Sequence, residues 1–141
     1  MNVSMKRSLF TTIIYGVLFL FLVIYFIAVG PEKFIEIKIH QVVCAVAFLT
    51  ALASFFLMLL FTRKKSDIID ERDAFIQKRA NTAGLLISLI YVFLLSIILF
   101  TVYRNEKVLS VSWMWFIAYS SFAFGYFITS LSHLYLCFYE G

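Results

Sequence analysis

The sequence predicts an all-α membrane protein whose four transmembrane helices pack as a bundle. Hydrophobic residues make up 63% of the 141-residue chain, and charged residues only 14%. A water-soluble domain has about 45–50% apolar and about 25% charged residues, so this chain cannot cover itself with polar surface in water. Four apolar runs are each near the roughly 20 residues that a helix needs to cross a bilayer. We expect a single membrane domain, residues 1–141, with every backbone polar group satisfied inside a helix.

The first expected span is residues 9–29, an uncharged run that follows Lys6 and Arg7. A positively charged start also fits a secretory signal peptide, but this apolar stretch is about twice as long as a typical signal core. We therefore predict a retained span. The other three spans are expected at residues 41–62, 83–103 and 111–139, and none of the four contains Asp, Glu, Lys or Arg.

The distribution of basic residues predicts the orientation. The N-terminal tail has two Lys or Arg residues and the middle loop, residues 63–82, has six, whereas each of the other two loops has two. Because loops rich in Lys and Arg stay in the cytoplasm, eight basic residues against four place both termini and the middle loop there. The expected location is the plasma membrane of a prokaryote.

Catalytic motifs are missing from the sequence. It has no Gly-rich phosphate loop, no H-E-x-x-H and no G-x-S-x-G. Cys44 and His40 lie near the outer end of the second span, and Cys137 and His133 lie near the inner end of the fourth. This separation is too large for a disulfide or for a metal site of the usual ligand number. We therefore expect no enzyme activity, no cofactor and no metal. We also expect no nucleic-acid partner, since the basic residues only flank apolar runs.

Two helix faces made of small residues are expected to pack closely. Residues at steps of three and four share one face of a helix, and small side chains allow helix backbones to approach each other in lipid. These faces should meet each other or a second copy of the protein. A polar seam for a small ligand or protons along the fourth span is the open alternative. The residues concerned are Ala47, Ala51 and Ser54 in the second span, and Ser121, Gly125, Thr129, Tyr126 and His133 in the fourth.

The middle loop is longer than a connector requires, and part of it has a helical pattern. At 100° per residue, Ile68, Phe75, Ile76 and Ala80 fall on one arc. Asp67 can cap the helix, because carboxylates suit the positive end of a helix. We predict that the third helix starts near Asp67 and projects into the cytoplasm before it enters the membrane.

Arg72 and Arg79 fall within the apolar arc of this predicted helix. Arginine stems can cover apolar surface while the guanidinium heads bind phosphate or carboxylate. Two interpretations stay open: anchoring in lipid headgroups, and pairing with an acidic group of another subunit or protein. The expected contact residues are Asp70, Glu71, Arg72, Asp73 and Arg79.

The same loop carries a resemblance to a known family. The D-E-R-D stretch Asp70–Asp73, followed by Ile76 and Ala80 and then directly by a span, resembles small prokaryotic four-span membrane proteins of the DUF2178 type. Arg79 stands before Ala80 where that pattern leads us to expect Lys. The resemblance covers the loop and the four-span layout. It implies no activity, because none is assigned to that family.

These features favour a non-enzymatic interaction or regulatory membrane protein. Its expected partners, besides the lipid bilayer, are further copies of itself or another membrane protein. The alternative is an oligomeric channel or transporter for a small solute along the polar fourth span. Ion-coupled transport is disfavoured, because such transporters usually keep a charged residue inside the membrane.

Overall fold

The computed structural model describes residues 3–61 and 71–140, and these residues form helices and short connections only. Four of the helices are long and apolar enough to cross a membrane. This confirms the predicted all-α fold with four long apolar helices. The helices are α1 (Val3–Val29), α2 (Pro31–Glu36), α3 (Lys38–Phe61), α4 (Glu71–Tyr103) and α5 (Ser112–Glu140).

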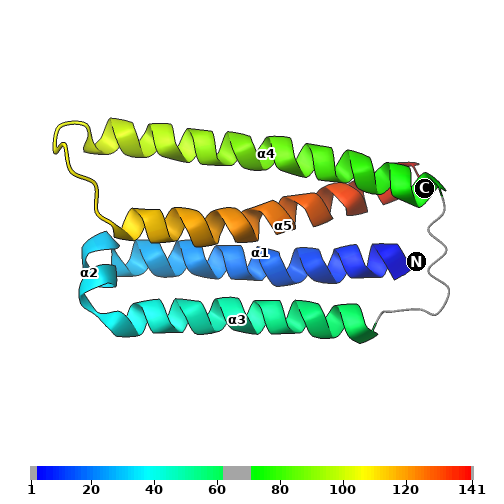
Figure 1. Ribbon diagram of the computed structural model, residues 1–141, viewed down its shortest axis with the longest axis horizontal. Coiled ribbons are helices and arrows are strands. Elements are labelled where there is room, and N and C mark those ends of the chain that lie inside the picture. Colours follow the sequence, from blue (N-terminus) through cyan, green and yellow to red (C-terminus); the bar gives the residue numbers. More distant parts are fainter. Residues whose placement is uncertain (1–2, 62–70, 141) are drawn as a thin grey trace.

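The four long helices lie side by side in the order α4, α5, α1, α3, as a flattened row with α3 and α4 at opposite edges (Figure 1). Both chain termini and the start of α4 lie at one end of the row, which we call the terminal end. The other end, which we call the α2 end, holds α2 and the loop between α4 and α5. Helices α1 and α5 therefore form the central pair, with α3 packed on α1 and α4 packed on α5.

Aromatic side chains connect helices beyond nearest neighbours in this row. Phe48 of α3 packs edge-on against Tyr119 of α5, with ring centroids 5.0 Å apart. Phe19 of α1 packs in the same way against Tyr91 of α4, at 5.9 Å. Each edge helix therefore contacts both helices of the central pair. These ring contacts stabilise the arrangement, because hydrophobicity alone does not hold helices together in lipid.

The turn between α1 and α3 contains the short helix α2, which the sequence did not lead us to expect. Gly30 ends α1 with φ 87°, a conformation that residues with a Cβ rarely adopt. Pro31 then occupies the first helical position of α2, where its missing N–H is not needed. Phe34 of α2 is buried against the core, so α2 closes the α2 end of the structure.

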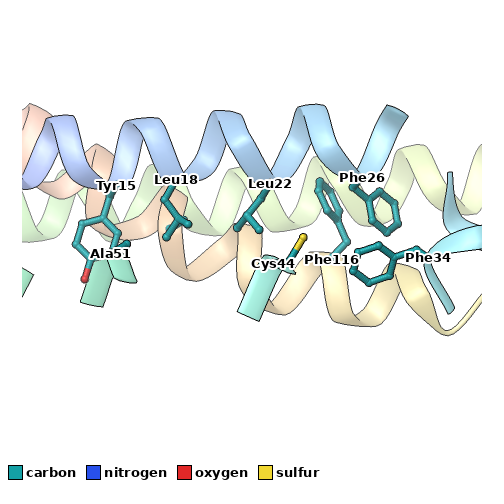
Figure 2. Close-up of a cluster of buried hydrophobic side chains, with 9 residues drawn as sticks. Tyr15, Leu18, Leu22, Phe26, Phe34, Cys44, Ala51 and Phe116 are labelled. Atoms are coloured by element: carbon teal, nitrogen blue, oxygen red, sulfur yellow. The ribbon is translucent and has the colours of Figure 1, made fainter. Parts of the chain in front are cut away.

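The core is a line of side chains along α1, shown in Figure 2. Phe26 stacks on Phe116 of α5 at 4.5 Å between ring centroids and meets Phe34 of α2 edge-on at 5.3 Å. Further along, Tyr15 stacks on Tyr126 of α5 at 4.9 Å. The buried residues of this core are Tyr15, Leu18, Leu22, Phe26, Phe34, Cys44, Ala51, Phe116 and Ala123.

Helix α4 contributes little to this core. It is a single helix of 33 residues, and its charged beginning runs without interruption into the apolar part. Most of its large apolar side chains are exposed, for example Phe93 at 65% and Ile90 at 56%. Exposed apolar side chains are expected where a helix faces lipid, because lipid tails are as apolar as leucine.

Candidate functional site

The candidate site begins at the terminal end, in the first three turns of α4, residues 71–81, which we call the charged segment. Glu71 and Arg72 are exposed there, and so is Arg79. The predicted helix start at Asp67 lies outside the described residues, as does Asp70. Asp73 lies within α4, but its side chain is outside the described part of the chain.

The apolar arc predicted for this segment is divided in the structure. Ile76 and Ala80 are buried, at 3% and 0% exposure, whereas Phe75 is 57% exposed. The Arg79 guanidinium lies over the Phe75 ring, with Cζ 5.7 Å from the centroid. This cation–π contact is on the outer surface, and Arg72 is exposed as well, so both arginine side chains are exposed although they border the buried residues on the helix. The charged segment presents an arginine and an aromatic ring away from the protein.

The buried face of α4 continues from Ile76 and Ala80 into a close contact with α5. Gly84, four residues beyond Ala80, approaches Thr129 so closely that a Cβ added at Gly84 would lie 2.9 Å from the Thr129 Cα. One turn further, Ser88 faces Gly125, where an added Cβ would lie 3.5 Å from the Ser88 Oγ. The small-residue face of α5 therefore packs against α4.

This partner face was missed in the sequence. Ala80, Gly84 and Ser88 are small residues spaced by four, the pattern that permits close helix approach in membranes. All positions from Leu85 to Ile90 except Ser88 are leucine or isoleucine, which makes the pattern of small residues hard to recognise. A search for small residues at steps of four in all spans would have found it.

The small residues of α3 have a different partner. Ala51 is buried in the core beside Tyr15 of α1, and Ala47 packs at the edge of the same core. Ser54, in contrast, is exposed. The faces predicted on the second and fourth spans therefore lie apart: one packs on α1 and the other on α4.

Two histidines attach the neighbouring helices to α1, one at each end of the row. At the terminal end the Ser8 hydroxyl lies 2.5 Å from His133 Nδ1 of α5, and both residues are buried. At the α2 end the Tyr25 hydroxyl lies 2.6 Å from His40 Nδ1 of α3. Buried polar groups need such partners, especially where no water is available. His133, predicted for helix packing or for a polar seam, thus takes part in a contact between helices.

Two hydroxyl groups in the interior differ from these paired histidines and hydroxyls in their hydrogen bonding. The oxygen atoms of Tyr15 and Ser121 are buried and have no hydrogen-bond partner in the described part of the protein. Elsewhere along α5 polar groups are paired: Ser120 accepts a hydrogen bond of 3.0 Å from the Tyr91 hydroxyl of α4, and the Thr129 hydroxyl donates to the Gly125 carbonyl.

Metal-ligating side chains do not gather anywhere in residues 3–61 and 71–140: no group of three His, Cys, Asp or Glu residues could hold an ion there. Cys44 and Cys137 are both buried. Cys137 Sγ lies 3.8 Å from His133 Nδ1, which makes a weak contact one helical turn apart. The arrangement of the described residues offers helix contacts and a charged surface.

Taken together, four apolar helices with a charged helical extension define a small multi-pass membrane protein. Comparison of the chain with family models, with curated proteins and with solved structures gave no match. The resemblance of Asp70–Asp73, Ile76 and Ala80 to the DUF2178 type therefore stays a prediction from that loop.

Proposed function

We propose that the protein is a non-enzymatic interaction or regulatory protein of a prokaryotic plasma membrane, and that the charged segment of α4 contacts its partner. The supporting observation is the division of the segment into buried and exposed residues. Ile76 and Ala80 are buried against the protein, whereas Arg72, Phe75 and Arg79, which border them on the helix, are exposed. A rigid helix that presents an aromatic residue beside arginines suits recognition, because these residue types are enriched at protein interfaces.

The partner on this proposal is a second membrane protein or another copy of this chain, with a carboxylate as the group recognised. Arginine binds a carboxylate through two parallel hydrogen bonds, which lysine cannot reproduce. Arg79 is additionally oriented by its contact with Phe75. Fixing the guanidinium in this way lowers the entropy lost when it binds.

A photo-crosslinking residue at Ala74, an exposed position in the charged segment, should give a discrete protein adduct in cells. We expect the adduct to disappear in the double variant Arg72→Lys, Arg79→Lys, because lysine lacks the planar fork of donors. The matched control is the same crosslinker at Ile90, on the exposed apolar side of α4, where lipid adducts should dominate. The measurement is gel electrophoresis and mass spectrometry of the adducts.

Two outcomes would contradict this interpretation. If alanine at both arginines leaves the adduct intact, the charged segment is only a connector. If lysine preserves the adduct and alanine abolishes it, the cations act on lipid phosphates and pairing with a carboxylate is wrong.

The proposed orientation puts the terminal end in the cytoplasm, as the distribution of basic residues favours. An impermeant thiol reagent added to intact cells should label Asn105→Cys at the α2 end and leave Gln77→Cys unlabelled. Both positions are exposed and uncharged, so these substitutions leave the charge balance unchanged. The native cysteines are buried, which keeps background labelling low. Labelling of Gln77→Cys alone would reverse the orientation.

The alternative function, a channel or transporter along α5, has one observation in its favour. The buried hydroxyls of Tyr15 and Ser121 lack hydrogen-bond partners in the described residues, and a buried hydroxyl without a partner costs about 1–3 kcal/mol. A hydrated path would remove that cost. Solute flux into vesicles containing the purified protein, with Tyr15→Phe and Ser121→Ala as variants, would separate a conducting protein from an interaction protein.

A further inference from the structure

A groove at the α2 end has the features of a lipid-binding site. It has a volume of about 460 Å³ and lies between the end of α4, the loop that follows, and the start of α5. Its lining has two chemically distinct parts. The apolar part includes Leu99, Phe100, Leu109 and Ile117, and the cationic part consists of Arg104 and Lys107.

The two parts lie at different depths in the membrane. Leu99 and Phe100 belong to the membrane-crossing portion of α4, which ends at Tyr103, and Ile117 belongs to that of α5. Arg104 is the first residue beyond the end of α4. The groove therefore runs from hydrocarbon depth to the level of the lipid headgroups. An occupant must be apolar at one end and polar at the other, as a phospholipid is.

The backbone at Lys107 supports a specific role for its side chain. Lys107 has φ 58°, the only positive φ of a residue other than glycine in the described chain. Its N–H donates a 3.2 Å hydrogen bond to the Tyr103 carbonyl, so Lys107 occupies the capping position after the last turn of α4. Glycine or asparagine usually takes this position, since a Cβ is unfavourable there. A lysine at such a site is a reason to look for function.

Charge complementarity decides which phospholipid fits. Arg104 and Lys107 both line the groove and are exposed, and the acidic Glu106 between them lines a neighbouring cavity that shares Tyr103 with the groove. Two cations facing one groove favour a phosphate that carries net negative charge. We propose that the groove binds an anionic phospholipid of the adjacent leaflet, with its phosphate held by Arg104 and Lys107 and an acyl chain along Leu99 and Ile117.

The test uses the full-length protein in detergent, with bound lipid counted by native mass spectrometry. The wild type should bind phosphatidylglycerol more tightly than phosphatidylcholine. The double variant Arg104→Gln, Lys107→Gln should weaken phosphatidylglycerol binding about tenfold or more, since each basic residue near anionic lipid contributes substantially to affinity. The matched control Lys33→Gln, Lys38→Gln removes the same charge at the same end but outside the groove, and should retain binding.

A second variant separates the groove from general attraction between charges. Ile117→Trp adds bulk to the apolar part and should weaken phosphatidylglycerol binding at unchanged net charge. Equal losses in both charge variants would overturn the proposal, because they would show non-specific attraction. Equal binding of both lipids would also overturn it, and displacement by inorganic phosphate alone would assign the cations to a free anion.

Discussion

Replacing Gly84 by alanine should loosen the contact between α4 and α5, whereas the same replacement at Gly125 should be tolerated. A Cβ at Gly84 would lie 2.9 Å from the Cα of Thr129, and a backbone atom cannot move aside without moving its helix. A Cβ at Gly125 would meet only the Ser88 hydroxyl at 3.5 Å, an ordinary contact. Both substitutions bring the same gain in helix propensity, so their difference reports packing.

The expected result is a loss of about 1–3 kcal/mol for Gly84→Ala, as for overpacked cores. Gly125→Ala should be neutral or stabilising by about 0.5–1 kcal/mol, the usual advantage of alanine over glycine within a helix. Thermal unfolding in detergent measures both. Leu94→Phe, on the exposed side of α4, is the control and should change nothing. Equal stability of the two glycine variants would mean that α4 and α5 do not approach closely at Gly84.

Replacing Phe26 by alanine should destabilise the protein strongly. Phe26 is 1% exposed and contacts rings from two other helices: Phe34 of α2, and Trp113 and Phe116 of α5. In lipid the transfer of the ring out of water contributes less than in a soluble core, so the cavity and the lost ring contacts dominate. We expect a loss of roughly 2 kcal/mol or more.

The control for this substitution is Phe93→Ala, which removes the same atoms from a side chain that is 65% exposed on α4. Its stability in detergent should stay close to that of the wild type. A similar loss in both variants would show that ring size, and not the contact between α1, α2 and α5, determines the effect. If the unfolding midpoint of Phe26→Ala equals that of the wild type, Phe26 does not contribute to the stability of the core.

The four long apolar helices follow from the sequence alone. Runs of about twenty apolar residues, with charged residues confined to the ends, have one stable conformation in a bilayer, because only a helix satisfies each backbone group locally. The long α4 also follows, since no glycine or proline interrupts residues 71–83. These properties depend on neighbours within a few residues, which the sequence states directly.

Part of the candidate site could also be predicted from the sequence. The charges of the middle loop are visible in the printed chain, as are the small residues of the fourth span and the position of His133 near its end. Which side of the charged segment is buried was not accessible. Ile76 and Phe75 are both apolar, and only the burial of Ile76 together with the exposure of Phe75 distinguishes them.

The order of the helices and the partner of each face were decided by the tertiary structure. Lipid solvates every apolar side chain equally well, so hydrophobicity does not indicate which face of a span turns inward. Gly125 and Thr129 could have met α3, but the complementary gap on α4, made by Gly84 and Ser88, fits them. Likewise Ser8 and His133 are 125 residues apart in the chain, and only the antiparallel packing of α1 on α5 brings their side chains within 2.5 Å. Such contacts depend on how well the shapes of two helix faces fit each other. The residues of each face can be read from the sequence, but the face that each one packs against cannot.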